Sequence, residues 1–155
     1  FDPFTGLLPG RGCGEEKESL WSESAQSVLE YQAGGLLAAG FITERPLEYE
    51  EARAGFDSPS SASPSAPMLG FYALAWGLRD GDRETIRIVL SSGQVLTEKS
   101  NTVPGNKAQW YRYVGGKQPS GGWPLGTYTA EYRIEREEAG RLRDVIAVTR
   151  EIEVR

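Results

Sequence analysis

The residues of this chain with a positive case for binding are aromatic and lie in its second half. Trp110, Tyr111 and Tyr113 fall within one short stretch, and side chains of a strand alternate between its two faces, so these rings cannot all point into one core. Trp123 lies in a Gly-Gly-Trp-Pro turn. We therefore expect Trp110, Tyr113 and Trp123 to supply exposed rings on which a polysaccharide stacks. The alternative is that Trp76 and one face of the Trp110 strand are core material.

Catalytic side chains are scarce by comparison. The 155 residues contain no histidine, so a Ser-His-Asp triad, a histidine general base and the usual zinc sites cannot be built from this chain alone. Carboxylates are plentiful, but they cluster at 15–18, 48–51 and 137–138, in stretches typical of turns and solvated faces rather than of a facing acid pair. We expect no catalytic residue, no metal site and no enzyme activity of this chain itself.

Two smaller features have structural explanations. Asp80 and Asp82 flank Gly81 without the ligand spacing of a helical calcium loop, so we expect a hairpin turn there. Cys13 lies between two glycines, and the chain has neither a histidine to activate it nor a second cysteine to pair with it. A structural role is expected for Cys13.

The charge balance argues against nucleic acid and anionic membranes as partners. Seventeen basic and 22 acidic residues give a net charge of −5, and no run of lysines and arginines supplies the clustered charge that phosphate backbones need. The longest nearly apolar stretch, residues 68–78, is far shorter than the roughly 20 residues of a membrane span. We expect neither nucleic acid nor an anionic membrane as a partner, and no transmembrane helix.

From residue 27 onward the sequence pattern is that of a β protein. Short runs of β-branched, aromatic and aliphatic residues alternate with turns rich in Gly, Pro, Asp and Ser, beginning with strands at 28–32 and 36–43,. We predict seven or eight short strands, no convincing amphipathic helix and an all-β fold, an antiparallel immunoglobulin-like β-sandwich over residues 27–155. An open barrel is the alternative. Arg150 interrupts the apolar face of the last strand, which indicates either a bulge or a change of pairing partner there.

Three segments interrupt this pattern. Residues 1–26 are rich in Gly and Pro and then in charge, and are predicted to be an irregular segment,. The chain starts at Phe1 without methionine, as expected of a processed, trimmed or excised piece. Residues 57–67 form a Ser/Pro-rich tract, which we predict to be a long exposed loop within the domain, with a weak domain boundary as the alternative. Residues 115–122 are a further predicted loop.

Short motifs spread over nearly the whole chain resemble one protein family. Their residues are Asp2-Pro3-Phe4, Gly6, Cys13-Gly14, Leu20-Trp21, Ala39-Gly40-Phe41, Gly77-Leu78, Gly81-Asp82, Asn106-Lys107-Ala108, Gly116-Lys117, Trp123-Pro124 and Gly126-Thr127-Tyr128. The first four resemble the stretch that follows the catalytic core in a bacterial subgroup of the lysostaphin-type zinc metallopeptidases. The others look like the β-sandwich appended to that core.

This resemblance implies a companion role rather than catalysis. The family cleaves peptide crosslinks of the bacterial cell wall with a zinc ion held by His-x-x-x-Asp and His-x-His motifs, and neither motif occurs in a chain without histidine. The resemblance therefore implies zinc only in a catalytic core outside this chain, a location in the periplasm or cell envelope, and as partners a peptidase core, in cis or in trans, and peptidoglycan. The chain would be a non-catalytic β-sandwich companion domain. The alternative is a free-standing carbohydrate- or cell-wall-binding module that uses its exposed aromatic rings.

Overall fold

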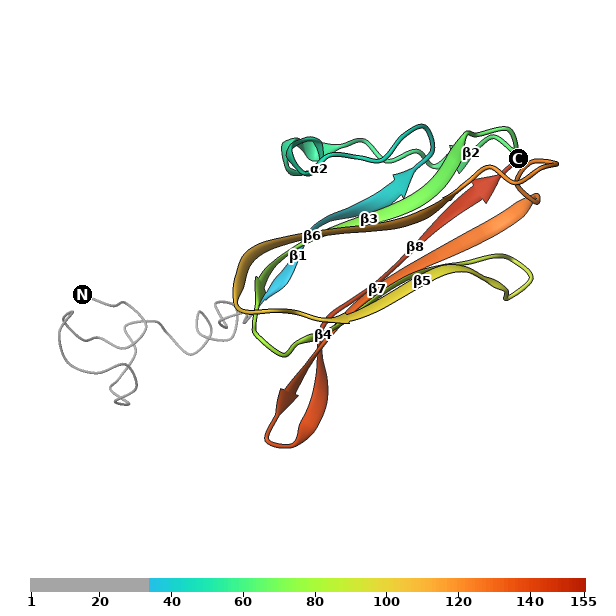
Figure 1. Cartoon of the computed structure of the whole chain (residues 1–155). Coiled ribbons are helices and arrows are strands. Elements are labelled where there is room, and N and C mark those ends of the chain that lie inside the picture. The colour runs from blue at the N-terminus through green and yellow to red at the C-terminus, as the bar shows by residue number, and fades with distance from the viewer. Residues whose placement is uncertain (1–33) are drawn as a thin grey trace, which may run out of the picture. The chain divides into compact units, whose positions relative to one another are not determined.

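Two sheets pack face to face in a computed structural model of the chain, which describes residues 34–155 (Figure 1). The predicted irregular segment at 1–26, the predicted strand at 28–32 and Cys13 lie outside the described residues. The first sheet has the strand order β1-β3-β6, formed by β1 (Gly35–Ile42), β3 (Met68–Leu78) and β6 (Lys107–Lys117). The second has the order β2-β8-β7-β4-β5, formed by β2 (Ser61–Ala62), β8 (Arg141–Val154), β7 (Gly126–Glu138), β4 (Arg83–Val89) and β5 (Val95–Thr102).

All strand pairs are antiparallel except that of β2 with β8. The predicted all-β sandwich is therefore confirmed. No helix in the described part of the chain has the length and apolarity needed to cross a membrane.

The core between the sheets is built on the face of β3 that carries its smaller residues. Phe71, Ala73 and Ala75 are fully buried and pack in one cluster with residues of β4, β7 and β8 such as Ile86 and Tyr132. Met68 and Tyr72 lie on the outer face of β3, away from the second sheet, and pack in a second cluster. Trp76, a core candidate by its sequence, is only half-buried.

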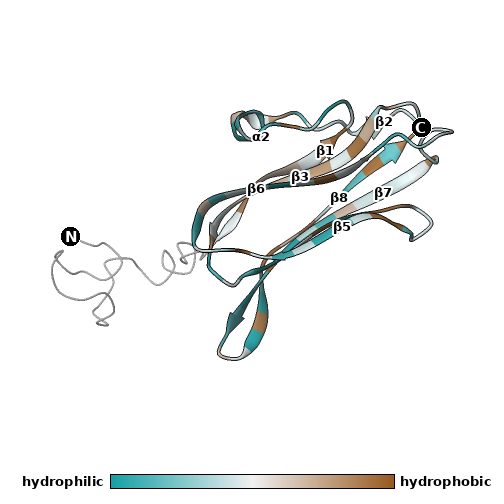
Figure 2. Cartoon of the chain, in the orientation of Figure 1, coloured by the Kyte–Doolittle hydropathy of each residue, from teal (hydrophilic) through white to brown (hydrophobic). Residues whose placement is uncertain are grey.

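Helix α2 (Tyr49–Gly55) covers part of that outer face (Figure 1). Glu48 and Glu51 form a capping box at its start: the carboxylate of each residue accepts a hydrogen bond from the backbone N–H of the other,. Ala52 turns inward and packs with Leu47 and Tyr72 in a second cluster. The helix and the loops beside it are mostly hydrophilic (Figure 2). Its single buried residue explains why the sequence pattern did not predict it.

Three local expectations differ from the structure. β6 continues to Lys117, so residues 115–117 belong to a strand instead of a loop. The Ser/Pro-rich tract contains β2, which pairs with the end of β8 and makes the tract a connection within the domain. The bulge in β8 falls at Val145, where the register with β7 shifts, and Arg150 keeps regular pairing with Ala130. A long arginine side chain can reach solvent from an otherwise apolar face without disturbing the strand.

Candidate binding groove

Trp123, one of the three predicted stacking rings, is buried. Its side chain is 3% exposed, and its indole Nε1 donates a hydrogen bond to the carbonyl oxygen of Ala66 at 2.8 Å. Gly121 and Gly122 both have positive φ, at 116° and 83°, and the tight turn that they form directs the indole inward. The prediction of an exposed ring at Trp123 is therefore wrong.

Trp110 is half-buried at the edge of the sandwich and packs against its core. Its indole Nε1 donates to Glu84 Oε1 at 2.8 Å. The Arg112 guanidinium lies over its ring, 4.2 Å from the centroid, and the Lys107 ammonium lies 5.5 Å from the same centroid. Trp110 is thus mainly a structural residue.

Glu84, the partner of Trp110, is a buried carboxylate with several donors. It is 1% exposed, and it also accepts hydrogen bonds from Tyr132 Oη at 3.0 Å and Arg112 Nε at 2.9 Å. Burial, followed by the negative charge of Glu84, raises the pKa of Tyr132 well above its usual value, which keeps the hydroxyl a donor,. The donors around this carboxylate hold it in a structural role rather than in a poised acid–base role.

The turn between β3 and β4 uses its two aspartates structurally, as the sequence indicated. Asp82 accepts hydrogen bonds from Arg136 Nε at 2.8 Å and Nη2 at 2.7 Å, and Asp80 accepts one from the backbone N–H of Gly105 at 2.7 Å. Within residues 34–155, no group of three His, Cys, Asp or Glu side chains is placed to hold a metal ion. The described residues therefore do not fit the zinc that the resemblance implies for the catalytic core.

Tyr113 is an exposed ring of the kind that the sequence predicted. It is 40% exposed on the outer face of β6, and it lines a groove of about 360 Å³. The loop after β1, the start of β3 and the end of β6 complete this groove. We call it the Tyr113 groove; the residues used below are Arg45, Pro46, Met68, Tyr113, Gly115 and Lys117.

A glycine forms the floor of the Tyr113 groove. Strand alternation places Tyr113, Gly115 and Lys117 on one face of β6. Gly115 pairs with Gly70 of β3, so no side chain rises from either residue of the pair. Tyr113 and Lys117 therefore stand roughly 13 Å apart along the strand, with a gap between them.

Other rings hold Tyr113 in place. The ring of Tyr111 lies 6.3 Å from that of Tyr113, and the ring of Tyr72 lies 6.4 Å from that of Tyr111. The Tyr111 hydroxyl donates to the carbonyl oxygen of Leu47, and burial raises the pKa of Tyr111 to about 12. The row of tyrosines is thus fixed at its inner end and exposed at Tyr113.

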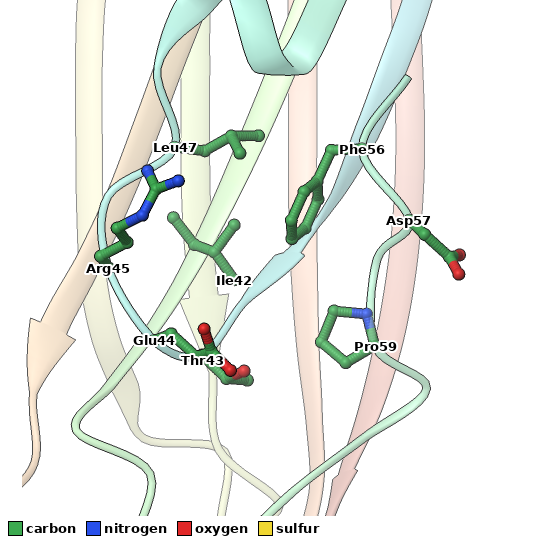
Figure 3. A pocket seen from close by; sticks show the side chains of 8 residues that line it. All are labelled: Ile42, Thr43, Glu44, Arg45, Leu47, Phe56, Asp57 and Pro59. Carbon is green, nitrogen blue, oxygen red and sulfur yellow. The ribbon is translucent and has the colours of Figure 1, made fainter. Parts of the chain in front are cut away.

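A second pocket, of about 290 Å³, lies beside the same loop. Figure 3 shows the Phe56 ring on one side of it, Leu47 and Arg45 on the other, and the Asp57 carboxylate directed away. Arg45 lines both pockets, and its Nη1 donates to Glu51 Oε2 at 2.9 Å. The arginine and the backbone N–H of Glu48 lower the pKa of Glu51 to about 2. Arg45, which lines both pockets, is therefore held by an ion pair to helix α2.

Comparison with known proteins identifies no family. No family model and no curated protein matches the chain. Among solved structures, a β-glucuronidase of Bifidobacterium dentium complexed with coumarin-3-O-glucuronide is 15% identical, with a TM-score of 0.42 over 78% of this chain and 18% of that one. The C-terminal domain of wzt is 10% identical, with a TM-score of 0.43 over 79% of this chain and 74% of that one. The chain thus spans less than a fifth of the glucuronidase, and both likenesses are too distant to assign a function.

Tyr113 could be identified from the sequence, but the groove beside it could not. Met68 and Lys117 were not singled out as binding residues, because their approach depends on the pairing of β3 with β6. The available signal was the Gly115-Gly116 pair directly after the aromatic run. Two glycines inside a strand indicate a place where a ligand or another backbone comes close.

Proposed function

We propose that this chain is a non-catalytic β-sandwich domain that binds carbohydrate in the Tyr113 groove. The observation that carries the proposal is the position of Tyr113: its ring is 40% exposed at the wall of a groove of about 360 Å³. Small-ligand clefts typically have volumes of roughly 300–1,000 Å³ and combine apolar walls with a few polar groups. The second pocket, at about 290 Å³, is smaller.

The chemistry of the groove suits a sugar ring, which has an apolar C–H face and a polar rim. Tyr113, Met68 and Pro46 supply the apolar surface. The ammonium group of Lys117 supplies hydrogen-bond donors for hydroxyl groups,. The missing side chain at Gly115 leaves backbone accessible at the floor.

The carboxylates support binding rather than hydrolysis. Glycoside hydrolysis uses two carboxyl groups that flank the scissile bond. Glu44 is the one carboxylate among the residues that line the Tyr113 groove. Glu84 and Asp82 are held by donors in the protein interior. A sugar bound in the groove would therefore lie beside one carboxyl group, that of Glu44, and not between two.

Binding of an N-acetylglucosamine hexamer by calorimetry, and retention on insoluble peptidoglycan, test the proposal. Tyr113→Ala should weaken binding by about tenfold, because it removes the stacking surface, and Tyr113→Phe should retain it. Phe56→Ala removes a ring of similar exposure, 37%, from the second pocket and should bind as the unaltered chain does. Unchanged binding by Tyr113→Ala, or a loss confined to Phe56→Ala, would place the ligand elsewhere. Failure of the unaltered chain to bind any glycan would reject the function.

We propose as a second candidate that this domain accompanies a lysostaphin-like zinc metallopeptidase that acts on cell-wall peptide crosslinks in the periplasm or envelope. Its support is the series of motifs in the sequence, of which Gly81-Asp82 forms the turn that binds Arg136 and Gly126-Thr127-Tyr128 begins β7. The zinc and its ligands would belong to the catalytic core. The reading frame upstream of Phe1 tests this proposal for a core in cis: it should encode His-x-x-x-Asp and His-x-His motifs, and a frame without them would reject a core on the same chain.

A further inference from the structure

All three lysines in the described part of the chain lie on β5 and β6. Lys99 is on β5, and Lys107 and Lys117 are the first and last residues of β6. None of the three forms an ion pair with any residue in 34–155, whereas most of the arginines there do. These ammonium groups are therefore available to an anionic ligand.

Positive charge is concentrated on these two strands although the whole chain carries a net charge of −5. Glu98 is the single acidic residue in β5 and β6, and its carboxylate lies 3.8 Å from Arg87 of β4. β5 and β6 are edge strands of different sheets and lie beside each other. Side chains of β5 and β6 thus border the same edge of the sandwich.

Two of the lysines lie over aromatic rings. The Lys99 ammonium is 5.9 Å from the centroid of Tyr113, and the Lys107 ammonium is 5.5 Å from that of Trp110,. Lys117 lines the Tyr113 groove itself. We call these five residues the lysine–aromatic strip. A cation beside an exposed ring can bind the charged group of a sugar whose ring stacks on the aromatic face.

We propose that the lysine–aromatic strip binds an acidic glycan, a chain of sugar rings that carries carboxylates at intervals, with the Tyr113 groove holding one part of it. The inference rests on the proposed carbohydrate-binding function and adds the charge class of the ligand. Lys107 and Lys117 are separated by roughly 33 Å of strand, which suits a polymer with widely spaced charges. A nucleic acid strand carries a phosphate about every 3.4 Å and calls for clustered cations.

Among the cations that line the Tyr113 groove, Lys117 is the one that would bind a carboxylate of the ligand. Arg45 also lines the groove, but both of its terminal nitrogens bind Glu51, at 2.9 Å and 2.5 Å. Glu44 lines the same groove, and its negative charge opposes an acidic ligand. Replacing Glu44 should therefore have the opposite effect to replacing Lys117.

The test compares a hyaluronan hexasaccharide, which has a carboxylate on every second ring, with its carboxyl-reduced form. The acidic form should bind about tenfold more tightly at low salt, and the difference should shrink as salt is added. Lys117→Gln should lower affinity for the acidic form by about fivefold and leave that for the reduced form unchanged, and Lys117→Arg should retain both. Glu44→Gln should tighten binding of the acidic form. Arg150→Gln removes an exposed charge from β8 and serves as the matched control.

The possible results separate this inference from the function on which it rests. Equal binding of both hexasaccharides, with Tyr113→Ala still impaired, would overturn the acidic ligand and leave carbohydrate binding intact. Absence of binding to either form and to the neutral hexamer would overturn both. A thymidine oligonucleotide that bound as tightly as the acidic glycan, with the same dependence on Lys117, would assign the strip to single-stranded nucleic acid instead.

Discussion

Gly115 of β6 lies opposite Gly70 of β3, and a Cβ atom at position 115 would stand 2.7 Å from the Gly70 Cα atom and 2.8 Å from the Leu69 carbonyl oxygen. Both contacts are with backbone, so a side chain at this position requires the two strands to move. The floor of the Tyr113 groove is therefore built into the packing of the first sheet, and the same pair of residues links binding to stability.

Substituting the two neighbouring glycines should have different effects. Gly115→Ala should lower the free energy of unfolding by about 1–3 kcal/mol, because the added methyl overpacks the strand pair, and it should weaken glycan binding. At Gly116 the nearest atom to an added Cβ is Cη2 of Trp123 at 3.6 Å, an ordinary contact. Gly116→Ala should stay within about 0.5 kcal/mol of the unaltered chain. Urea denaturation measures both, and equal effects would contradict the close approach at Gly115.

The buried carboxylate of Glu84 should contribute far more to stability than an exposed one. Glu84→Ala leaves Trp110 Nε1 and Tyr132 Oη without their acceptor, and should cost about 3 kcal/mol or more. Glu98→Ala removes an exposed contact with Arg87 and should cost less than about 1 kcal/mol. Chemical denaturation followed by tryptophan fluorescence compares the two variants. A small decrease in the free energy of unfolding for Glu84→Ala would show that water replaces the carboxylate as hydrogen-bond acceptor.

The sequence predicted the strands well but could not show which face of β3 lies inside. Alternation separates Phe71 and Ala73 from Tyr72 in either case,. Tyr72 turns outward because α2 and its flanking loop provide a second cover, formed by Leu47 and Ala52. That cover depends on a helix of seven residues, which is too short to reveal its period in the sequence.

The groove was harder to predict than the ring beside it. The exposure of Tyr113 followed from the run of aromatic residues in one strand, which a single core face cannot accommodate. The groove depends on the register of Gly70 with Gly115, and the burial of Trp123 depends on the carbonyl of Ala66, 57 residues earlier. Contacts between distant segments have no local signature in the sequence. The turn around Trp123 therefore gave no sign of its burial, and the predicted exposure was wrong.

Acid should weaken the attachment of α2 through Glu51. Its pKa is lowered from near 4.5 to about 2 by Arg45 and by the backbone N–H of Glu48. A carboxyl group with a lowered folded-state pKa stabilises the fold above its unfolded-state pKa and loses that contribution as the pH falls through the folded value. Glu51→Gln should therefore lower Tm at pH 7, and the difference from the unaltered chain should disappear between about pH 4.5 and pH 2.

Glu50→Gln is the matched control for Glu51→Gln. Glu50 belongs to the same helix, and its carboxylate lies 3.8 Å from Arg53 in an exposed pair. This variant should leave Tm nearly unchanged at both pH values. A Tm difference for Glu51→Gln that persisted at pH 2 would show that the carboxylate acts through packing instead of charge.

A chain that starts at residue 27 should fold and bind as the full chain does. Both buried clusters of the described part draw on residues between Phe41 and Val154, and β1 begins at Gly35. Removing residues 1–26 should lower the free energy of unfolding by at most a few kcal/mol and leave glycan affinity unchanged. A chain that starts at residue 44 would lose all of β1, including the buried Ile42, and should not fold stably. Circular dichroism and urea denaturation compare the three chains, and unfolding of the chain that starts at residue 27 would show that residues 1–26 belong to the core.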